Sequence, residues 1–158
     1  MSSSSLRKTL SATADAYLDA HRTLSPTALA SVYSPNAKHS NYPAPVTPIF
    51  PSVSNAAYLE GVKDLFTIWT SFEVNEFAPR VVDEDTRRVV LFVEGVGETV
   101  SMGTYRNEYV VVLGCDTDGK LIDDRLQFFD SAGLLAWVGK MGEKARELQE
   151  KVVGEDQR

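Results

Sequence analysis

The sequence contains one cysteine, Cys115, among its 158 residues. A single cysteine cannot form an intrachain disulfide, and metal sites built from cysteine need several thiolates, so both are excluded. Basic residues are also few, because 16 Lys and Arg stand against 22 Asp and Glu and give a net charge of -6. A nucleic-acid surface requires clustered Lys and Arg, and the sequence has no such cluster. We therefore expect a protein of a reducing compartment that binds no nucleic acid.

Long hydrophobic runs are absent as well. No stretch approaches the roughly 18 apolar residues of a membrane span, and the Ser-rich start, residues 2–5, lacks the apolar centre of a signal peptide. We expect a cytoplasmic protein without a membrane partner. With 43% hydrophobic and 24% charged residues, the composition is typical of one globular domain, residues 1–158, with residues 1–5 and 154–158 frayed.

Apolar residues at helical spacing predict four helices. The first covers roughly residues 6–22, and Ser25-Pro26 starts a short second helix with Ser25 as its N-cap. The third is expected over Asn55 to Ser71 with Ser54 or Asn55 as its N-cap, and the fourth starts at Ser131. The apolar stripe of this last helix continues to Val152, so the helix is longer than one small sheet would cover. The distal half is suited to packing on a second subunit, so we expect a homodimer.

Between these helices the composition favours strands. Phe72 to Val82 is rich in strand-forming residues, and its Pro79 indicates a sheet edge or a bulge. Arg88 to Val96 is a second strand, and the glycines that follow it indicate a bend. Thr104 to Ala132 is two apolar runs joined by Asp-Thr-Asp-Gly-Lys, the pattern of a long hairpin with Gly119 in the left-handed conformation. The expected sheet therefore has about four antiparallel strands.

Residues 37–53 carry four prolines, which favour extended, turn-rich structure. The segment is either a plain surface connection or the wall of a pocket. His39 and Asn41 lie at its polar start. Because imidazole shuttles protons near neutral pH, His39 is a candidate catalytic residue.

Asp130 ends the second strand of the hairpin, directly before the last predicted helix. Strand alternation places Ile122, Leu126, Phe128 and Asp130 on one face, so this carboxylate would end an apolar row. A carboxyl group in apolar surroundings is suited to general acid or base catalysis. Asp130 is therefore a candidate catalytic residue, and the alternative is that it only caps the helix that follows.

The hairpin turn decides which side chains face Asp130. A two-residue turn at Asp118-Gly119 puts Asn107 opposite Asp130, whereas a three-residue loop with a bulge at Gly119 puts Arg106 there. The second register is preferred, because the turn sequence favours a type I turn. The pocket residues are Asn107 and Tyr109 in the first register, and Glu108 and Arg106 in the second.

The chain resembles a SnoaL-like member of the NTF2-like superfamily, and within it the small fungal proteins of polyketide and meroterpenoid biosynthesis. The resemblance spans roughly residues 6–140. It lies in Tyr105-Arg106-Asn107-Glu108-Tyr109, in Phe128-Phe129-Asp130-Ser131, and in residues 34–39 followed by Pro43. It implies an α+β fold, in which a strongly curved antiparallel sheet is wrapped by three to four helices around a blind pocket.

The resemblance also implies an enzyme that needs no cofactor. The expected activity is acid/base isomerisation or cyclisation of a small hydrophobic substrate derived from a polyketide or terpenoid. An epoxide hydrolase, a dehydratase or a non-catalytic binding module on the same fold is the alternative. In bacterial polyketide cyclases an Asp at the end of a late strand is the acid/base, and Asp130 matches that position.

The remaining candidates divide by role. Glu108 is a candidate second carboxylate, since two carboxylates in one dry pocket divide into an acid and a base; alternatively it pairs with Arg106 or Arg125 on a solvated face. His21 lies on the buried face of its helix and is either a core residue or a pocket residue. The two histidines lack metal-ligand spacing, so no metal is expected. Aromatic residues that are either core or substrate wall are Tyr17, Tyr58, Trp69, Tyr109 and Phe128.

Overall fold

The computed structural model describes residues 3–44 and 46–155. Its elements, in chain order, are α1 (Ser3–Arg22), α2 (Pro26–Ser31), β1 (Tyr33–Tyr42), β2 (Val53–Ser54), α3 (Asn55–Thr67), β3 (Trp69–Asp83), β4 (Arg88–Thr99), β5 (Thr104–Cys115), β6 (Ile122–Phe129) and α4 (Ser131–Glu155). Of the ends expected to fray, residues 1–2 and 156–158 lie outside the described part, and residues 3–5 and 154–155 belong to α1 and α4. None of the described helices combines the length and apolar character of a membrane span.

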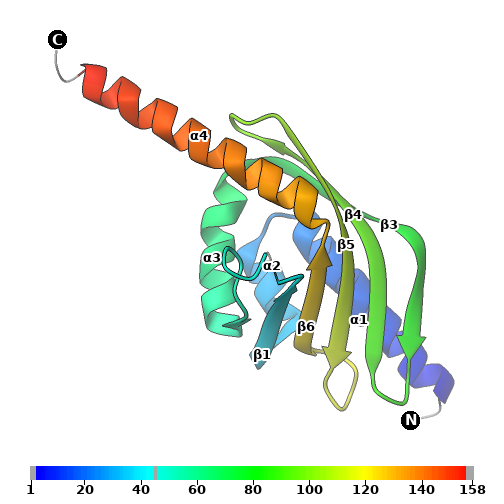
Figure 1. The fold of residues 1–158 in the computed structure, drawn as a ribbon. Coiled ribbons are helices and arrows are strands. Elements are labelled where there is room, and N and C mark those ends of the chain that lie inside the picture. The colour runs from blue at the N-terminus through cyan, green and yellow to red at the C-terminus, as the bar shows by residue number, and fades with distance from the viewer. Residues whose placement is uncertain (1–2, 45, 156–158) are drawn as a thin grey trace.

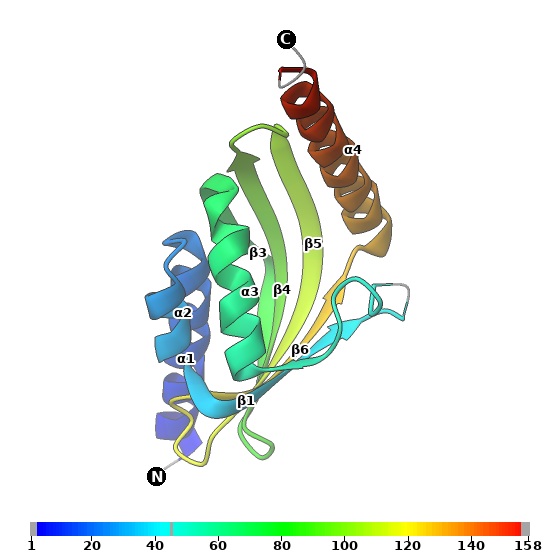
Figure 2. The same cartoon turned by 90° about the vertical axis from the view of Figure 1, so that its left-hand side faces the viewer.

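The strands form one curved sheet in the order β2-β1-β6-β5-β4-β3. Neighbouring strands are antiparallel except β1 and β6, which run parallel. Helices α1, α2 and α3 lie on one side of the sheet, and α4 projects past its end (Figures 1 and 2). The expected α+β architecture is confirmed, with six described strands in place of four.

Two apolar clusters hold the helices to the sheet. The larger lies between α1, α2, α3 and the inner sheet face, and its fully buried members are Leu10, Leu29, Val89, Leu91, Leu113 and Ile122. The smaller one fixes the start of α4, where Trp137 stacks on Trp69 with ring centroids 5.4 Å apart. Phe66, Phe72 and Tyr109 pack against both clusters and so connect them.

Several local predictions are confirmed by capping and backbone geometry. The Ser25 hydroxyl accepts a hydrogen bond from the Ala28 amide at the start of α2, and Ser54 caps α3 in the same way. Pro79 lies in β3, an edge strand whose pairing with β4 is irregular around that residue. Gly119 has φ +73° in the hairpin loop, as the turn sequence predicts.

Other local predictions are wrong. Residues 33–42 form strand β1, which tolerates Pro35 at an irregularity in its pairing with β6 and pairs continuously from Lys38 to Tyr42, before Pro43. Helix α3 ends at Thr67, and Trp69 already pairs with Thr99 in the sheet. Gly97 lies inside β4 and not in a bend; the glycine is needed for packing, since a Cβ atom there would come within 2.6 Å of the Trp69 ring.

Both hairpin registers considered from the sequence are also wrong. Near the loop Cys115 pairs with Ile122, but the next pair is Gly114 with Asp124, so Asp123 is an extra residue in β6. This bulge shifts the remaining ladder by one residue. As a result Glu108 lies opposite Asp130, and the Asp130 amide donates to the Glu108 carbonyl at 3.0 Å.

The bulge also reverses the faces of β6, because one inserted residue changes the alternation of every later side chain. Arg125, Gln127 and Phe129 point to the inner face and line the cavity described below. Phe128 points outward, is 43% exposed and stacks on Tyr42. The predicted apolar row ending in Asp130 is therefore the outer row of the strand beyond the bulge.

Candidate functional site

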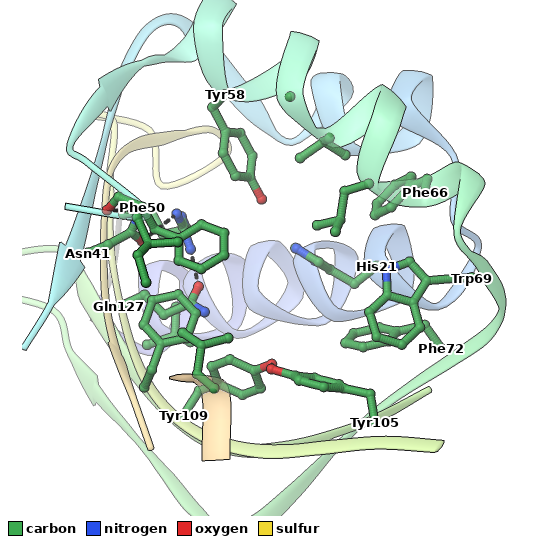
Figure 3. A pocket seen from close by; sticks show the side chains of 18 of the residues that line it. His21, Asn41, Phe50, Tyr58, Phe66, Trp69, Phe72, Tyr105, Tyr109 and Gln127 are labelled. Atoms are coloured by element: carbon green, nitrogen blue, oxygen red, sulfur yellow. Dashed lines mark hydrogen bonds between the residues drawn. The ribbon is translucent and has the colours of Figure 1, made fainter. Parts of the chain in front are cut away.

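A cavity of about 580 Å³ lies between α1, α3, the inner face of the sheet, residues 49–53 and the start of α4. Its wall is mainly aromatic and aliphatic (Figure 3). Ile49, Phe50, Pro51 and Val53 belong to this wall, so the proline-rich segment is not a plain surface connection. The polar side chains of the lining are Tyr17, His21, Asn41, Tyr58, Asp64, Tyr105, Tyr109, Arg125 and Gln127.

Arg125 is the only basic residue among the described lining residues apart from His21, and it is 3% exposed. Its Nη2 donates to Asn41 Oδ1 at 3.1 Å, its Nη1 donates to Gln127 Oε1, and its Nε donates to His39 Nδ1 at 3.1 Å. The guanidinium carbon lies 4.8 Å from the centre of the Tyr58 ring. All of these partners are uncharged, so the cavity wall carries a positive charge.

His39 lies behind Arg125 and is fully buried. Because its Nδ1 accepts from Arg125, the proton is on Nε2, which donates to Asn55 Oδ1 at 3.1 Å. Asn55 in turn donates to the Ser34 carbonyl at 3.1 Å. Burial and the charge of Arg125 lower the pKa of His39 to about 4, so the ring is neutral near pH 7. His39 therefore positions Arg125 and does not line the cavity.

His21 points from α1 into the middle of the cavity (Figure 3). Its Nδ1 donates to the Tyr17 carbonyl at 2.9 Å, which fixes the proton on that nitrogen and leaves a lone pair on Nε2. Burial lowers the pKa of His21 to about 4, with a smaller contribution from Arg125 in the same direction. A neutral imidazole with one free nitrogen can accept a proton from a bound molecule.

Tyr105 and Tyr109 project from β5 into the cavity, with their hydroxyl oxygens 2.5 Å apart. Burial raises the pKa of Tyr105 to about 12 and that of Tyr109 well above its ordinary value, so both phenols keep their protons near pH 7. When one hydroxyl donates to the other, the second proton remains available to an oxygen atom in the cavity. The pair is therefore a neutral hydrogen-bond donor.

The predicted carboxylates do not lie in this cavity. Asp130 is exposed, and its Oδ1 accepts from the Ala132 amide at 3.1 Å, as a helix cap does. Glu108 is exposed on β5, because Glu108 and Arg106 alternate with the inward-facing Tyr105 and Tyr109. Arg106 forms an ion pair with Glu94 at 2.5 Å and is likewise outside the lining.

Asn107 is buried, but its amide donates to the Asp130 carbonyl at 3.2 Å, beside the cavity lining. Phe128 lies on the outer face. The structure does bring together the other expected pocket residues in the lining: Tyr17, His21, Asn41, Tyr58, Trp69 and Tyr109.

Sequence reasoning missed Arg125 and Gln127, because strand alternation without the bulge places them outside. The consecutive polar pair Asp123-Asp124 is the local signal that alternation breaks there. In the described residues, no three His, Cys, Asp or Glu side chains gather as a metal site would require.

No family model matches the chain. Austinoid biosynthesis clusters protein H of Penicillium brasilianum is 32% identical over 120 residues, which cover 75% of this chain and 80% of that protein. This chain belongs to the protein H family. The relative is fungal, and the fold is NTF2-like, as the sequence motifs predict.

Two solved structures extend this assignment. BvnE pinacolase from Penicillium brevicompactum has a TM-score of 0.82 and 26% identity, covering 89% of this chain and 99% of that one. AusH from Aspergillus nidulans has a TM-score of 0.73 and 26% identity, covering 79% of this chain and 86% of its own. These two solved structures therefore share with this chain the arrangement of the elements that surround the cavity.

Proposed function

We propose that this protein is a cofactor-independent acid/base isomerase or cyclase of fungal secondary metabolism. Its substrate is a hydrophobic intermediate derived from a polyketide or terpenoid. The observation that carries the proposal is the apolar cavity in which a neutral His21 and a cationic Arg125 are both presented. Membership of the protein H family and the likeness to a pinacolase support a biosynthetic rearrangement or ring-forming step.

The proposed chemistry uses these groups in separate roles. His21 Nε2 takes a proton from a carbon or hydroxyl of the substrate and returns it at a second position. Negative charge that develops on a substrate oxygen is stabilised by Arg125 in a site of low dielectric. The Tyr105 and Tyr109 pair donates a hydrogen bond to a second oxygen. No proton is lost or gained overall, which suits an isomerisation.

The experiment that tests this proposal is turnover of the substrate by the His21→Gln variant. Gln lacks a titratable nitrogen, so we expect a loss of about 10²-fold or more in kcat. Lys8→Ala, on an exposed position of α1, is the matched control and keeps full turnover. If His21→Gln folds normally and stays within about threefold of wild type, the assignment of the base is wrong.

Asp130→Asn separates this assignment from the one based on sequence alone. Asn also caps helices, so the variant keeps the N-cap while removing the carboxylate. With His21 as the base, Asp130→Asn retains turnover within about threefold. A loss of about 10²-fold instead restores Asp130 as the acid/base group. If the wild type binds but never converts its ligand, the protein is a binding module.

We further propose that the protein acts as a homodimer in the cytoplasm, with a small hydrophobic molecule as its substrate and neither nucleic acid nor membrane as a partner. Helix α4 supports the dimer, because it extends well past the sheet (Figure 1). An amphipathic helix that is longer than the core it packs against can bury the rest of its apolar face against a second copy of the chain.

A further inference from the structure

Arg125 is a buried cation without a buried anion. Among the described residues no carboxylate oxygen lies within 4.0 Å of its guanidinium, whereas Arg7, Arg22, Arg80 and Arg106 all have such partners. Asp64 is the only acidic residue among the described lining residues, and it is exposed on α3. The positive charge on the cavity wall is therefore not neutralised by a carboxylate of the described residues.

Nearby phenols do not supply the missing charge. The side chains of Tyr17 and Tyr33 have pKa values raised above their ordinary range by burial, so both remain neutral. The Tyr58 ring contributes a cation–π contact, which is weaker than an ion pair. Since an unpaired charge in an apolar interior is unfavourable, a ligand anion would gain most at this point of the cavity.

The guanidinium retains donors for such a ligand. A guanidinium has five N–H bonds, of which the contacts to His39, Asn41 and Gln127 use one each. Tyr17 lies within hydrogen-bonding reach as well. One N–H bond on each terminal nitrogen is thus not used by these three contacts, and Arg125 belongs to the cavity lining. The three neutral partners hold the group rigid, as a preorganised anion site requires.

Amide side chains and an aromatic wall lie on opposite sides of the cavity. Asn41 and Gln127 gather at one side, and Phe66, Trp69 and Phe72 form the opposite wall, with His21 projecting between the two (Figure 3). A bound molecule would place its charged end at Arg125 and its apolar body against the aromatic wall. Its middle would then lie beside His21.

We propose that the substrate carries a delocalised oxyanion, either a carboxylate or the enolate of a 1,3-dicarbonyl group, and that Arg125 binds it. This inference rests on the proposed function and names its substrate class. Both kinds of anion share one charge between two oxygens, a geometry that matches the guanidinium. The substrate therefore enters this reaction before, and not after, its acidic group is esterified or otherwise neutralised.

Binding of unreactive probes tests the inference by calorimetry at pH 7. The carboxylate probe is 2-naphthoate, compared with neutral 2-naphthamide; the enolate probe is 2-acetylcyclohexane-1,3-dione, compared with its methyl enol ether. We expect at least one anion to bind wild-type protein about tenfold or more tightly than its neutral counterpart. The probe that shows this preference distinguishes the two sources of the oxyanion.

Three variants locate the effect. Arg125→Gln is expected to reduce the preference to within about twofold, and Arg125→Lys to keep part of it, because Lys retains the charge but not the bidentate geometry. Arg106→Gln, whose arginine lies outside the cavity, is the matched control and keeps the full preference. Should Arg125→Gln not fold, Gln127→Leu still applies: it frees one donor of Arg125, and the anion preference must persist or grow.

Equal binding of both anions and their neutral counterparts by wild-type protein overturns the inference. So does a full preference that survives in Arg125→Gln. These readouts need no turnover, so they are separate from the His21→Gln test of the proposed function. A protein that loses turnover in His21→Gln yet shows no anion preference retains the proposed function and loses only this substrate class.

Discussion

Acidification should destabilise this protein through His39. The ring is fully buried, and its Nδ1 accepts a hydrogen bond from a guanidinium. If Nδ1 gained a proton, this hydrogen bond would be lost, because the N–H of His39 would then point at the N–H of Arg125. The folded-state pKa is therefore lowered from 6.5 to about 4. Because the unfolded chain binds this proton more tightly, stability is fully present above pH 6.5 and is lost as the pH falls toward 4.

The size of the effect follows from those two values. A histidine that titrates near 6.5 when unfolded and at about 4 when folded loses about 2 kcal/mol of stability between pH 7 and pH 5. His21, whose pKa burial also lowers to about 4, adds a loss of similar size by the same linkage. The chain has only these two histidines, so no other side chain ordinarily titrates in this window.

Urea unfolding of the wild type, His39→Gln and His21→Gln at both pH values measures these contributions. We expect His39→Gln to be less stable than wild type at pH 7, because Arg125 loses its partner. Its stability should change by about 2 kcal/mol less between pH 7 and pH 5 than that of wild type. If the two proteins lose the same stability on acidification, His39 is not held neutral by Arg125 and the reasoning fails.

Two further predictions concern packing and assembly. Gly97→Ala should destabilise the protein by about 1–3 kcal/mol in thermal unfolding, because the added Cβ would lie 2.6 Å from the Trp69 ring. Gly139→Ala in α4 is the control: nothing lies within 4 Å, and alanine should stabilise the helix by about 0.5–1 kcal/mol. Light scattering after size-exclusion chromatography should give twice the mass of the 17.4 kDa chain, and a single-chain mass would refute the homodimer.

The sequence by itself determined the elements that depend on neighbouring residues. Helical spacing of apolar side chains indicated the four helices, and Ser25-Pro26 and Ser54 marked the starts of two of them. The Asp-Gly turn placed the hairpin, with Gly119 at positive φ. These signals are local, because capping, turn geometry and amphipathic spacing each act within a few residues. The family motifs added the NTF2-like fold.

Only the tertiary structure decided which side chains share the cavity. One extra residue at Asp123 shifted the hairpin register and reversed every later face of β6. It took Phe128 out of the expected pocket and brought Arg125 in, where His39 and Asn41 reach it from the parallel neighbour β1. The same shift leaves Asp130 as a helix cap. The turn that joins two strands does not by itself determine their register, because a bulge beyond the turn shifts the pairing of every later residue.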